Sequence, residues 1–188
     1  YGIGCWKGRS VSDIMVQNQL ITAKGSKGRF TLPDGSVVWL NSESKLTYPN
    51  RFTGGRRFVS LEGEAYFEVA KDAKKPFVVQ AGEVDVEVLG TCFDLDSYSS
   101  GEFIEIALLN GSVKISGKAV KEPVCLKPNE LFRYRKSDQY SSVEEVKAGL
   151  YADWIKDRLV FDNDCLSDIL ISMEGRYNME IECPQPFA

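Results

Sequence analysis

Three glutamates on one alternating segment are the first candidates for chemistry. In LEGEAYFEV, residues 61–69, Glu62, Glu64 and Glu68 share one predicted strand face with Tyr66. Neighbouring side chains on such a face lie about 7 Å apart, within the range of a glycosidase carboxylate pair. That chemistry needs one acid whose pKa is raised in an apolar pocket. A row of charges on one strand is more typical of a solvated face, which is our interpretation.

A second candidate is the acid and hydroxyl pair of Asp34 and Ser36, within LPDGSVVWLNSESKLTYP, residues 32–49. A nucleophilic serine needs a neighbouring base, and the sequence places none beside it. The residues Pro33 and Gly35 that frame this pair are typical of a tight turn. The polar residues that follow predict a bend that hydrogen-bonds its own backbone, with a tryptophan as core anchor: Asn41, Ser42, Ser44 and Trp39.

The chain contains no histidine, which removes the usual catalytic triads and histidine-bound metal sites. The acids of FDLDSY, Asp94 and Asp96, lack the glycine and the spacing of an EF-hand loop. No pair of cysteines is spaced C-x-x-C, so we interpret the thiols as buried or incidental. We therefore predict no catalytic residue, cofactor or metal. The five cysteines are Cys5, Cys92, Cys125, Cys165 and Cys183.

Two short basic runs could bind phosphate or an acidic partner. The simpler interpretation is a charged hairpin tip for the first run and a solvated turn for the second. The net charge of −4 argues against a nucleic-acid binder, because such proteins carry basic stripes. The first run contains Arg51, Arg56 and Arg57, and the second contains Lys71, Lys74 and Lys75.

The elements that position these residues are predicted to be strands. Apolar and polar residues alternate over 61–69 and 84–88, which is typical of half-buried strands. The Asn110-Gly111 pair predicts a hairpin over residues 103–116. Recurrent turns with few helix signals indicate a mainly β fold. We predict an antiparallel all-β sandwich or roll, with an irregular β-solenoid as the alternative.

The pattern changes near the end of the chain, where a β-α-β unit is predicted. Residues 159–161 and 179–183 have strand character. Residues 141–154, which connect the predicted β domain to this unit, could be a linker or one helical turn. The apolar residues between the two predicted strands are spaced as one helix face: Leu166, Ile169, Leu170, Met173 and Tyr177. We therefore divide the chain into a linker at 1–18, an all-β domain at 19–140, and a linker plus β-α-β unit at 141–188.

Several phrases in fixed order resemble the periplasmic region of FecR-type anti-sigma factors. They are LPDGSVVWLNSESKLTYP, RRFVSLEGEAYFEVAKDAKKPFVV, VDVEVLGTCFDL and IALLNGSVKI. This sequence departs from the family pattern after Phe93, at residues 94–98. The resemblance implies that the matching residues define the fold and that none is catalytic. These residues are Asp34, Gly35, Leu40, Asn41, Tyr48, Pro49, Gly63, Glu64, Ala65, Tyr66, Phe67, Pro76, Phe77, Gly90, Thr91 and Phe93.

The resemblance also implies a role in cell-surface signalling. The parent protein would be anchored in the inner membrane of a Gram-negative bacterium, with residues 1–18 following a missing anchor and the rest in the periplasm. A TonB-dependent outer-membrane transporter of iron chelates or glycans would bind this region through its periplasmic signalling domain. A cytoplasmic segment, absent here, would hold an extracytoplasmic-function sigma factor. The alternative is a carbohydrate-binding or structural cell-envelope domain without sigma regulation.

The tail resembles the first half of a secretin and TonB short N-terminal domain, whose second half is missing. Such an incomplete module leaves strand edges that can accept a partner strand. We therefore hypothesise that the transporter docks on the tail, although the same residues could instead pack within the fold. The predicted partner-binding residues are Leu159, Val160, Phe161, Tyr177, Asn178 and Met179.

Overall fold

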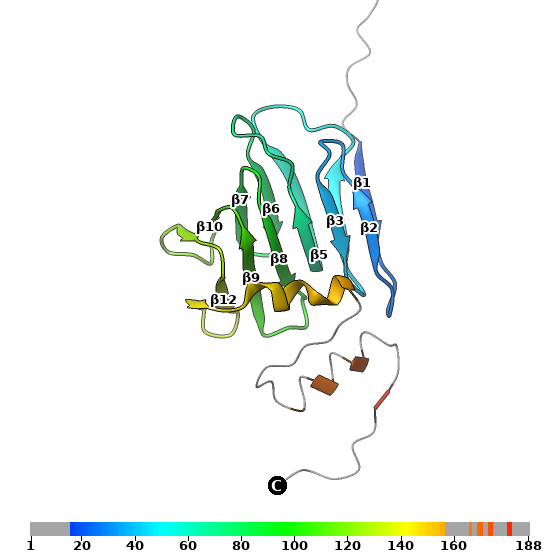
Figure 1. Cartoon of the computed structure of the whole chain (residues 1–188), viewed down its shortest axis with the longest axis vertical. Coiled ribbons are helices and arrows are strands. Elements are labelled where there is room, and N and C mark those ends of the chain that lie inside the picture. The colour runs from blue at the N-terminus through cyan, green and yellow to red at the C-terminus, as the bar shows by residue number, and fades with distance from the viewer. Residues whose placement is uncertain (1–15, 157–165, 167–168, 171–172, 175–179, 182–188) are drawn as a thin grey trace, which may run out of the picture.

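The computed structural model describes residues 16–156 and, in the tail, residues 166, 169–170, 173–174 and 180–181. Thirteen strands and one 3-10 helix occupy the first of these ranges (Figure 1). Their bounds are β1 Gln17–Ile21, β2 Gly28–Thr31, β3 Val37–Leu40, β4 Lys45–Pro49, β5 Arg57–Glu68, β6 Phe77–Ala81, β7 Val84–Val88, β8 Cys92–Ser97, β9 Phe103–Asn110, β10 Val113–Ser116, β11 Val124–Leu126, β12 Glu130–Arg135, β13 Tyr140–Glu145 and η1 Ala148–Lys156.

The long strand β5 joins the two parts of a curled sheet. Its first half pairs with β4 and, in parallel, with β6, whereas its second half pairs with β3 and β8. The strand changes partners at Gly63, whose φ is +97°. A Cβ at this glycine would lie 2.4 Å from Ser44 Oγ. Glycine is therefore the residue that allows β5 to pass so close to the bend after β3.

One apolar core lies between the two parts of the sheet. Side chains from both halves of β5 contribute to it, together with β6, β7 and β10 on one side and β8, β9 and β12 on the other. The predicted alternation holds in β7, where Val84, Val86 and Val88 are buried while Asp85 and Glu87 are partly exposed. The prediction of a mainly β fold is confirmed.

The hairpin predicted at Asn110-Gly111 is wrong. Strand β9 pairs with β8 and β12, whereas β10 pairs with β7 and β11, so the turn carries the chain from one part of the sheet to the other. A neighbouring corner at Gly90 does the same between β7 and β8. The two corners touch, since Thr91 Oγ1 donates to Ser112 O at 3.0 Å. Both edges of β9 are occupied, and β10 therefore finds its partners elsewhere.

The strands extend slightly past the limits that the sequence suggested for the β domain. Residues 17–18, assigned to the first linker, begin β1, and residues 141–145, assigned to the second, form most of β13. The predicted β-α-β unit lies largely outside the described residues and stays a prediction. Of its described residues, Leu166, Ile169, Leu170, Met173 and Glu174 are helical. The described residues include no helix long and apolar enough to span a membrane.

Candidate functional site

The predicted docking residues cannot be placed from this structure. Leu159, Val160 and Phe161 fall within 157–165, and Tyr177, Asn178 and Met179 fall within 175–179. All six lie outside the described residues. What the structure does describe is the segment that leads to them, the 3-10 helix η1, and the sheet face beneath it.

Helix η1 lies across the strands of one sheet part (Figure 1). Ala152 and Trp154 on this helix pack against Tyr66 in a second, smaller apolar cluster. The ring of Trp39 meets Tyr66 edge-on, with centroids 5.4 Å apart. Tyr66, predicted on a solvated face, is therefore buried, and Trp39 packs in this cluster rather than in the main core. Local sequence patterns do not reveal this cover, because η1 is distant from Tyr66 in the chain.

A buried carboxyl beneath η1 holds the helix to the sheet. Asp94 on β8 is only 3% exposed, and Trp154 Nε1 donates to its Oδ1 at 3.0 Å. Burial, followed by the nearby charge of Glu64, raises the pKa of Asp94 well above its usual value. A second bond fixes the end of the helix, because Lys27 Nζ donates to Trp154 O at 2.8 Å.

Next to Asp94 runs a row of charged residues at matching positions of four paired strands. Glu64 on β5 faces Asp96 on β8, which faces Glu105 on β9, and Glu105 faces Arg133 on β12. Directly opposed side chains on a sheet have Cβ atoms about 5 Å apart, so like charges there destabilise the fold. Two partners at the row's ends offset this repulsion: Asn41 Nδ2 donates to Glu64 Oε2 at 2.6 Å, and Arg133 pairs with Glu105.

The middle member of the row, Asp96, retains a proton more readily than a free aspartate. Burial raises its pKa to about 6, and the charge of Glu105 acts in the same direction. The backbone N–H of Tyr98, which donates to Asp96 Oδ1 at 3.1 Å, and the charge of Lys136 act in the opposite direction. The two aspartates with raised pKa, Asp94 and Asp96, thus lie two positions apart on the same strand, β8.

Asp94 has the raised pKa that general-acid catalysis requires, but it lacks access to a substrate. Asp94 is sealed beneath Trp154, and a glycan could not reach it without displacement of η1. Among the described residues, no three histidine, cysteine or acidic side chains are placed to hold a metal ion. Glu62 and Glu68 are the exposed members of the predicted acidic face, and Glu62 pairs with Lys45 at 2.9 Å. The arrangement can store protons and position η1.

The turn that contains Asp34 and Ser36 is part of a second buried network. Strands β2 and β3 form the predicted hairpin around it, which is confirmed. Ser36 Oγ donates to Asp34 Oδ2 at 2.7 Å and accepts a bond from the backbone N–H of Ala70. Arg57 Nη1 donates to the same Asp34 oxygen at 2.7 Å. Asp34 therefore anchors a buried arginine, a role that turn chemistry alone does not reveal.

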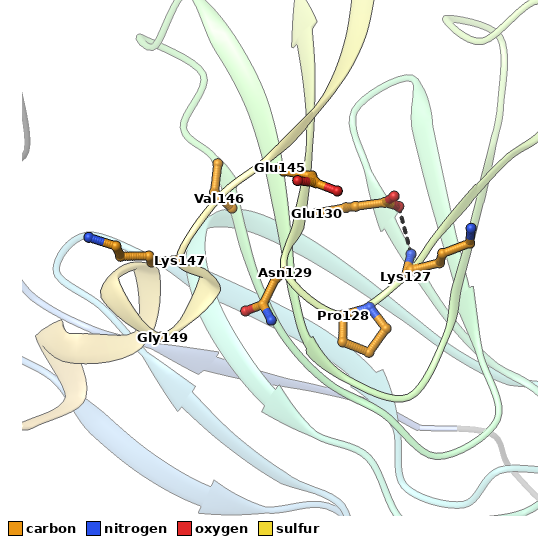
Figure 2. Close-up of a pocket in the computed structure, with 8 residues that line it drawn as sticks. All are labelled: Lys127, Pro128, Asn129, Glu130, Glu145, Val146, Lys147 and Gly149. Atoms are coloured by element: carbon orange, nitrogen blue, oxygen red, sulfur yellow. Dashed lines mark hydrogen bonds between the residues drawn. The ribbon is translucent and has the colours of Figure 1, made fainter.

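A surface hollow of about 590 Å³ lies where β13 meets η1. Figure 2 shows its lining, in which the backbone N–H of Lys127 donates to the carboxylate of Glu130 at 2.7 Å. Lys147 and Glu145 also line it. Cationic and acidic side chains thus balance each other here, so the hollow shows no preference for a charged ligand.

The sequence profile of the family described as "FecR protein" matches residues 18–114. The chain belongs to the FecR family. Two crystal structures, each of a candidate anti-sigma factor from Parabacteroides distasonis ATCC 8503, are similar to this FecR chain. The first, at 2.50 Å resolution, is 30% identical with a TM-score of 0.83, over 88% of this chain and 76% of that one. The second, at 1.65 Å, is 31% identical with a TM-score of 0.82, over 87% and 76%. No curated protein matches significantly.

The FecR match spans most of β1 through the first half of β10 and leaves β11, β12, β13 and η1 beyond it. The cover over Asp94 is thus contributed by a part of the chain that the family profile does not reach. The signal for it in the sequence is weak. Asp94 and Asp96 alternate with apolar residues in FDLD, which places them on one strand face but does not say what lies above.

Proposed function

We propose that this FecR chain is the periplasmic, signal-receiving region of a membrane-anchored anti-sigma factor in a Gram-negative bacterium. A TonB-dependent outer-membrane transporter, loaded with an iron chelate or a glycan, presents its signalling domain to this region. The loaded state is relayed to an extracytoplasmic-function sigma factor held by a cytoplasmic segment. The observation that carries the proposal is the similarity to candidate anti-sigma factors over 88% of the chain.

The geometry of the described residues supports regulation rather than catalysis. The carboxyl of Asp94, whose pKa is raised by burial, lies under η1, and Asp34 is engaged by Arg57 and Ser36. Catalysis requires an acid or nucleophile within hydrogen-bonding distance of a bound substrate. A receiver of protein signals requires instead a stable scaffold and a segment that responds to binding. Helix η1, fixed to the sheet by a few identifiable contacts, fits that second need.

We further propose that the transporter docks on the tail residues Leu159, Val160, Phe161, Tyr177, Asn178 and Met179. Leu159 follows the last residue of η1, Lys156, by three positions. A protein that binds at Leu159 to Phe161 acts within a few positions of Trp154, whose bonds with Asp94 and Lys27 hold η1. Binding energy at the tail can therefore shift the equilibrium between attached and detached η1.

Calorimetric titration of this chain with the periplasmic signalling domain of the TonB-dependent transporter encoded nearest its gene tests the proposal. We expect micromolar or tighter binding, and loss of most of it in Val160→Pro, because proline removes a backbone donor from a strand. Lys114→Glu, an exposed change on β10, is the matched control and should bind normally. Absence of binding to the unchanged chain would refute the receiver role, and normal binding by Val160→Pro would refute docking at the tail.

A further inference from the structure

The two basic runs that are separate in the sequence meet in one pocket. Arg51 and Arg57 from the first run and Lys71 and Lys75 from the second line the same cavity of about 440 Å³. The parallel pairing of β5 with β6 brings them together, since Arg57 lies opposite Phe77, two residues after Lys75. The sequence predicted a hairpin tip for the first run and a solvated turn for the second. In the structure the two runs lie side by side and together form one pocket.

Arg57 forms the buried base of this basic pocket. Its side chain is 2% exposed, and it donates through Nε to Lys75 O and through Nη1 to Ala70 O, each at 2.8 Å. Its Nη2 is buried and has no hydrogen-bond partner. Arg57 Cζ lies 5.4 Å from the centroid of the Phe77 ring, which is a weaker partner than an oxygen. Buried donors are almost always satisfied, so the guanidinium of Arg57, which lines the pocket, retains an unused hydrogen-bonding group.

The rim of the pocket carries cations that are available to a ligand. Arg51 and Lys71 are exposed, and neither takes part in an ion pair of the residues that the structure describes. Lys75 donates to Phe52 O, which holds its ammonium group at the wall. Four cationic side chains and two acidic ones, Asp34 and Asp72, line the pocket, so its net charge is positive.

We propose that this basic pocket binds a carboxylate from an acidic peptide segment of a protein partner. This inference deepens the proposed function and rests on it for the partner's role. The planar guanidinium of Arg57 suits a carboxylate, and Phe52 and Pro33 offer apolar contact for a glutamate stem. The chain as a whole carries a net charge of −4, so this pocket is a local exception that selects where an acidic segment docks.

Nuclear magnetic resonance titration of the isotope-labelled chain with a short polyglutamate peptide, blocked at both ends, tests the pocket. We expect shifts of the Arg57 side-chain N–H signals and of the backbone amides at Arg51 and Lys71. The affinity should be weak and should fall as salt is added, because exposed charges contribute much of it. In Arg51→Glu/Lys71→Glu, affinity should drop by about tenfold or more. Both positions are exposed, so the fold is retained.

The matched control is Lys127→Glu/Lys147→Glu, which changes the same number of charges at the balanced hollow of Figure 2. This variant should bind the peptide as the unchanged chain does. An equal loss in both variants would show a general charge effect and overturn the assignment. Shifts elsewhere, no shifts, or equal binding of inorganic phosphate at the same concentration would also overturn it.

A separate measurement distinguishes this inference from the proposed function. The transporter signalling domain is titrated against the unchanged chain and against Arg51→Glu/Lys71→Glu. Equal binding to both leaves the receiver role standing and overturns the pocket as a docking site for that partner. Peptide binding at the pocket, with no binding of the signalling domain to either chain, supports an acidic-segment site and refutes the receiver role.

Discussion

At the scale of single residues, two buried polar networks depend on partners that are far apart in the chain. Asp94 and Trp154 are separated by 60 positions, and Arg57 and Asp34 by 23. Each network removes charged or polar groups from water, which is favourable only while every partner is in place. Single substitutions in these networks should therefore lower the free energy of unfolding more than substitutions of exposed residues nearby.

Substitution of Arg57 tests the network that joins it to Asp34. Arg57→Met should lower the free energy of unfolding by about 3–5 kcal/mol, because it leaves Asp34 without its buried partner. Arg56→Met next to it should cost no more than about 1 kcal/mol, since Arg56 is exposed and its contact with Glu87 is 3.8 Å long. Urea unfolding at pH 7 measures both. Similar losses in the two variants would contradict the role given to Arg57.

The raised pKa of Asp96 predicts that the stability of the fold depends on pH. Its pKa is about 6 in the folded chain, above the value of about 3.9 for a free aspartate. The folded state therefore binds the proton more tightly than the unfolded state. The contribution of Asp96 to stability is complete below pH 4, is lost as the pH rises to about 6, and stays lost above it.

Comparison of Asp96→Asn with the unchanged chain isolates this contribution. The stability difference between the two should change by about 2 kcal/mol between pH 4 and pH 6.5, with the unchanged chain losing relative stability as the pH rises. All other residues are the same in both proteins, so the change in the difference with pH reports on Asp96. Glu122→Gln, at an exposed site, is the control. A constant difference across this range would contradict the prediction.

At the scale of elements, β5 and η1 determine how the sheet closes and what covers it. Gly63 allows β5 to pass from one part of the sheet to the other, and Trp154 fixes η1 over β8. Both positions combine a local requirement with a distant contact. Position 63 requires a glycine because its φ is positive and Ser44 lies close to it. The indole N–H of Trp154 requires an acceptor, which Asp94 on β8 provides.

Gly63→Ala should destabilise the chain by about 2–5 kcal/mol. The new methyl group meets both a positive φ and the backbone of Ser44, whose Cα would lie 2.8 Å from it. Gly55→Ala is the control, because a Cβ there has nothing within 4 Å. Thermal unfolding of the two variants provides the comparison. A Gly63→Ala protein as stable as Gly55→Ala would show that the bend in β5 tolerates a side chain.

Trp154→Phe should loosen η1 while it keeps most of the apolar contact. The lost N–H bond leaves Asp94 without a donor from the indole, at a cost of about 1–3 kcal/mol.

Asp94→Asn retains an acceptor and removes a buried charge, so this variant should equal or exceed the unchanged chain in stability at pH 7. Denaturant unfolding checks both. Unchanged stability in Trp154→Phe would mean that the indole N–H does not hold η1.

At the scale of the whole molecule, stability should fall from the shared strand toward the outer strands. Strand β5 has paired neighbours along both parts of the sheet, whereas among the described strands β13 pairs only with β12 and β1 only with β4. The side chains of β13 are mostly exposed, which leaves little apolar contact to hold it.

Hydrogen exchange in the native state should follow this order. Amides of β5, β8 and β9 should exchange only through global unfolding, and those of β13 and β1 through local opening at much lower free energy. Mass spectrometry of protease fragments after exchange resolves the segments. If the shared strand β5 exchanged as fast as β13, the continuous core between the two parts of the sheet would not be the unit that unfolds.

The amino-acid sequence by itself determined the strands, most of the turns and the family, because these depend on neighbours in the chain. Alternation in residues 61–69 and 84–88, and the turn at Pro33-Asp34-Gly35, are local patterns that survive in the fold. The same local logic failed at Asn110-Gly111, where a hairpin signal yields a corner because β9 pairs on both edges with other strands.

Only the tertiary structure decided what the polar residues do. The glutamate strand has one buried tyrosine because η1, more than 80 residues later, covers it. Two basic runs form one pocket because β5 and β6 pair in parallel. Burial and charge proximity depend on distance in space, which local sequence patterns do not encode. The sequence therefore specified the elements, and the packing of those elements set the chemistry of Asp94, Asp96 and Arg57.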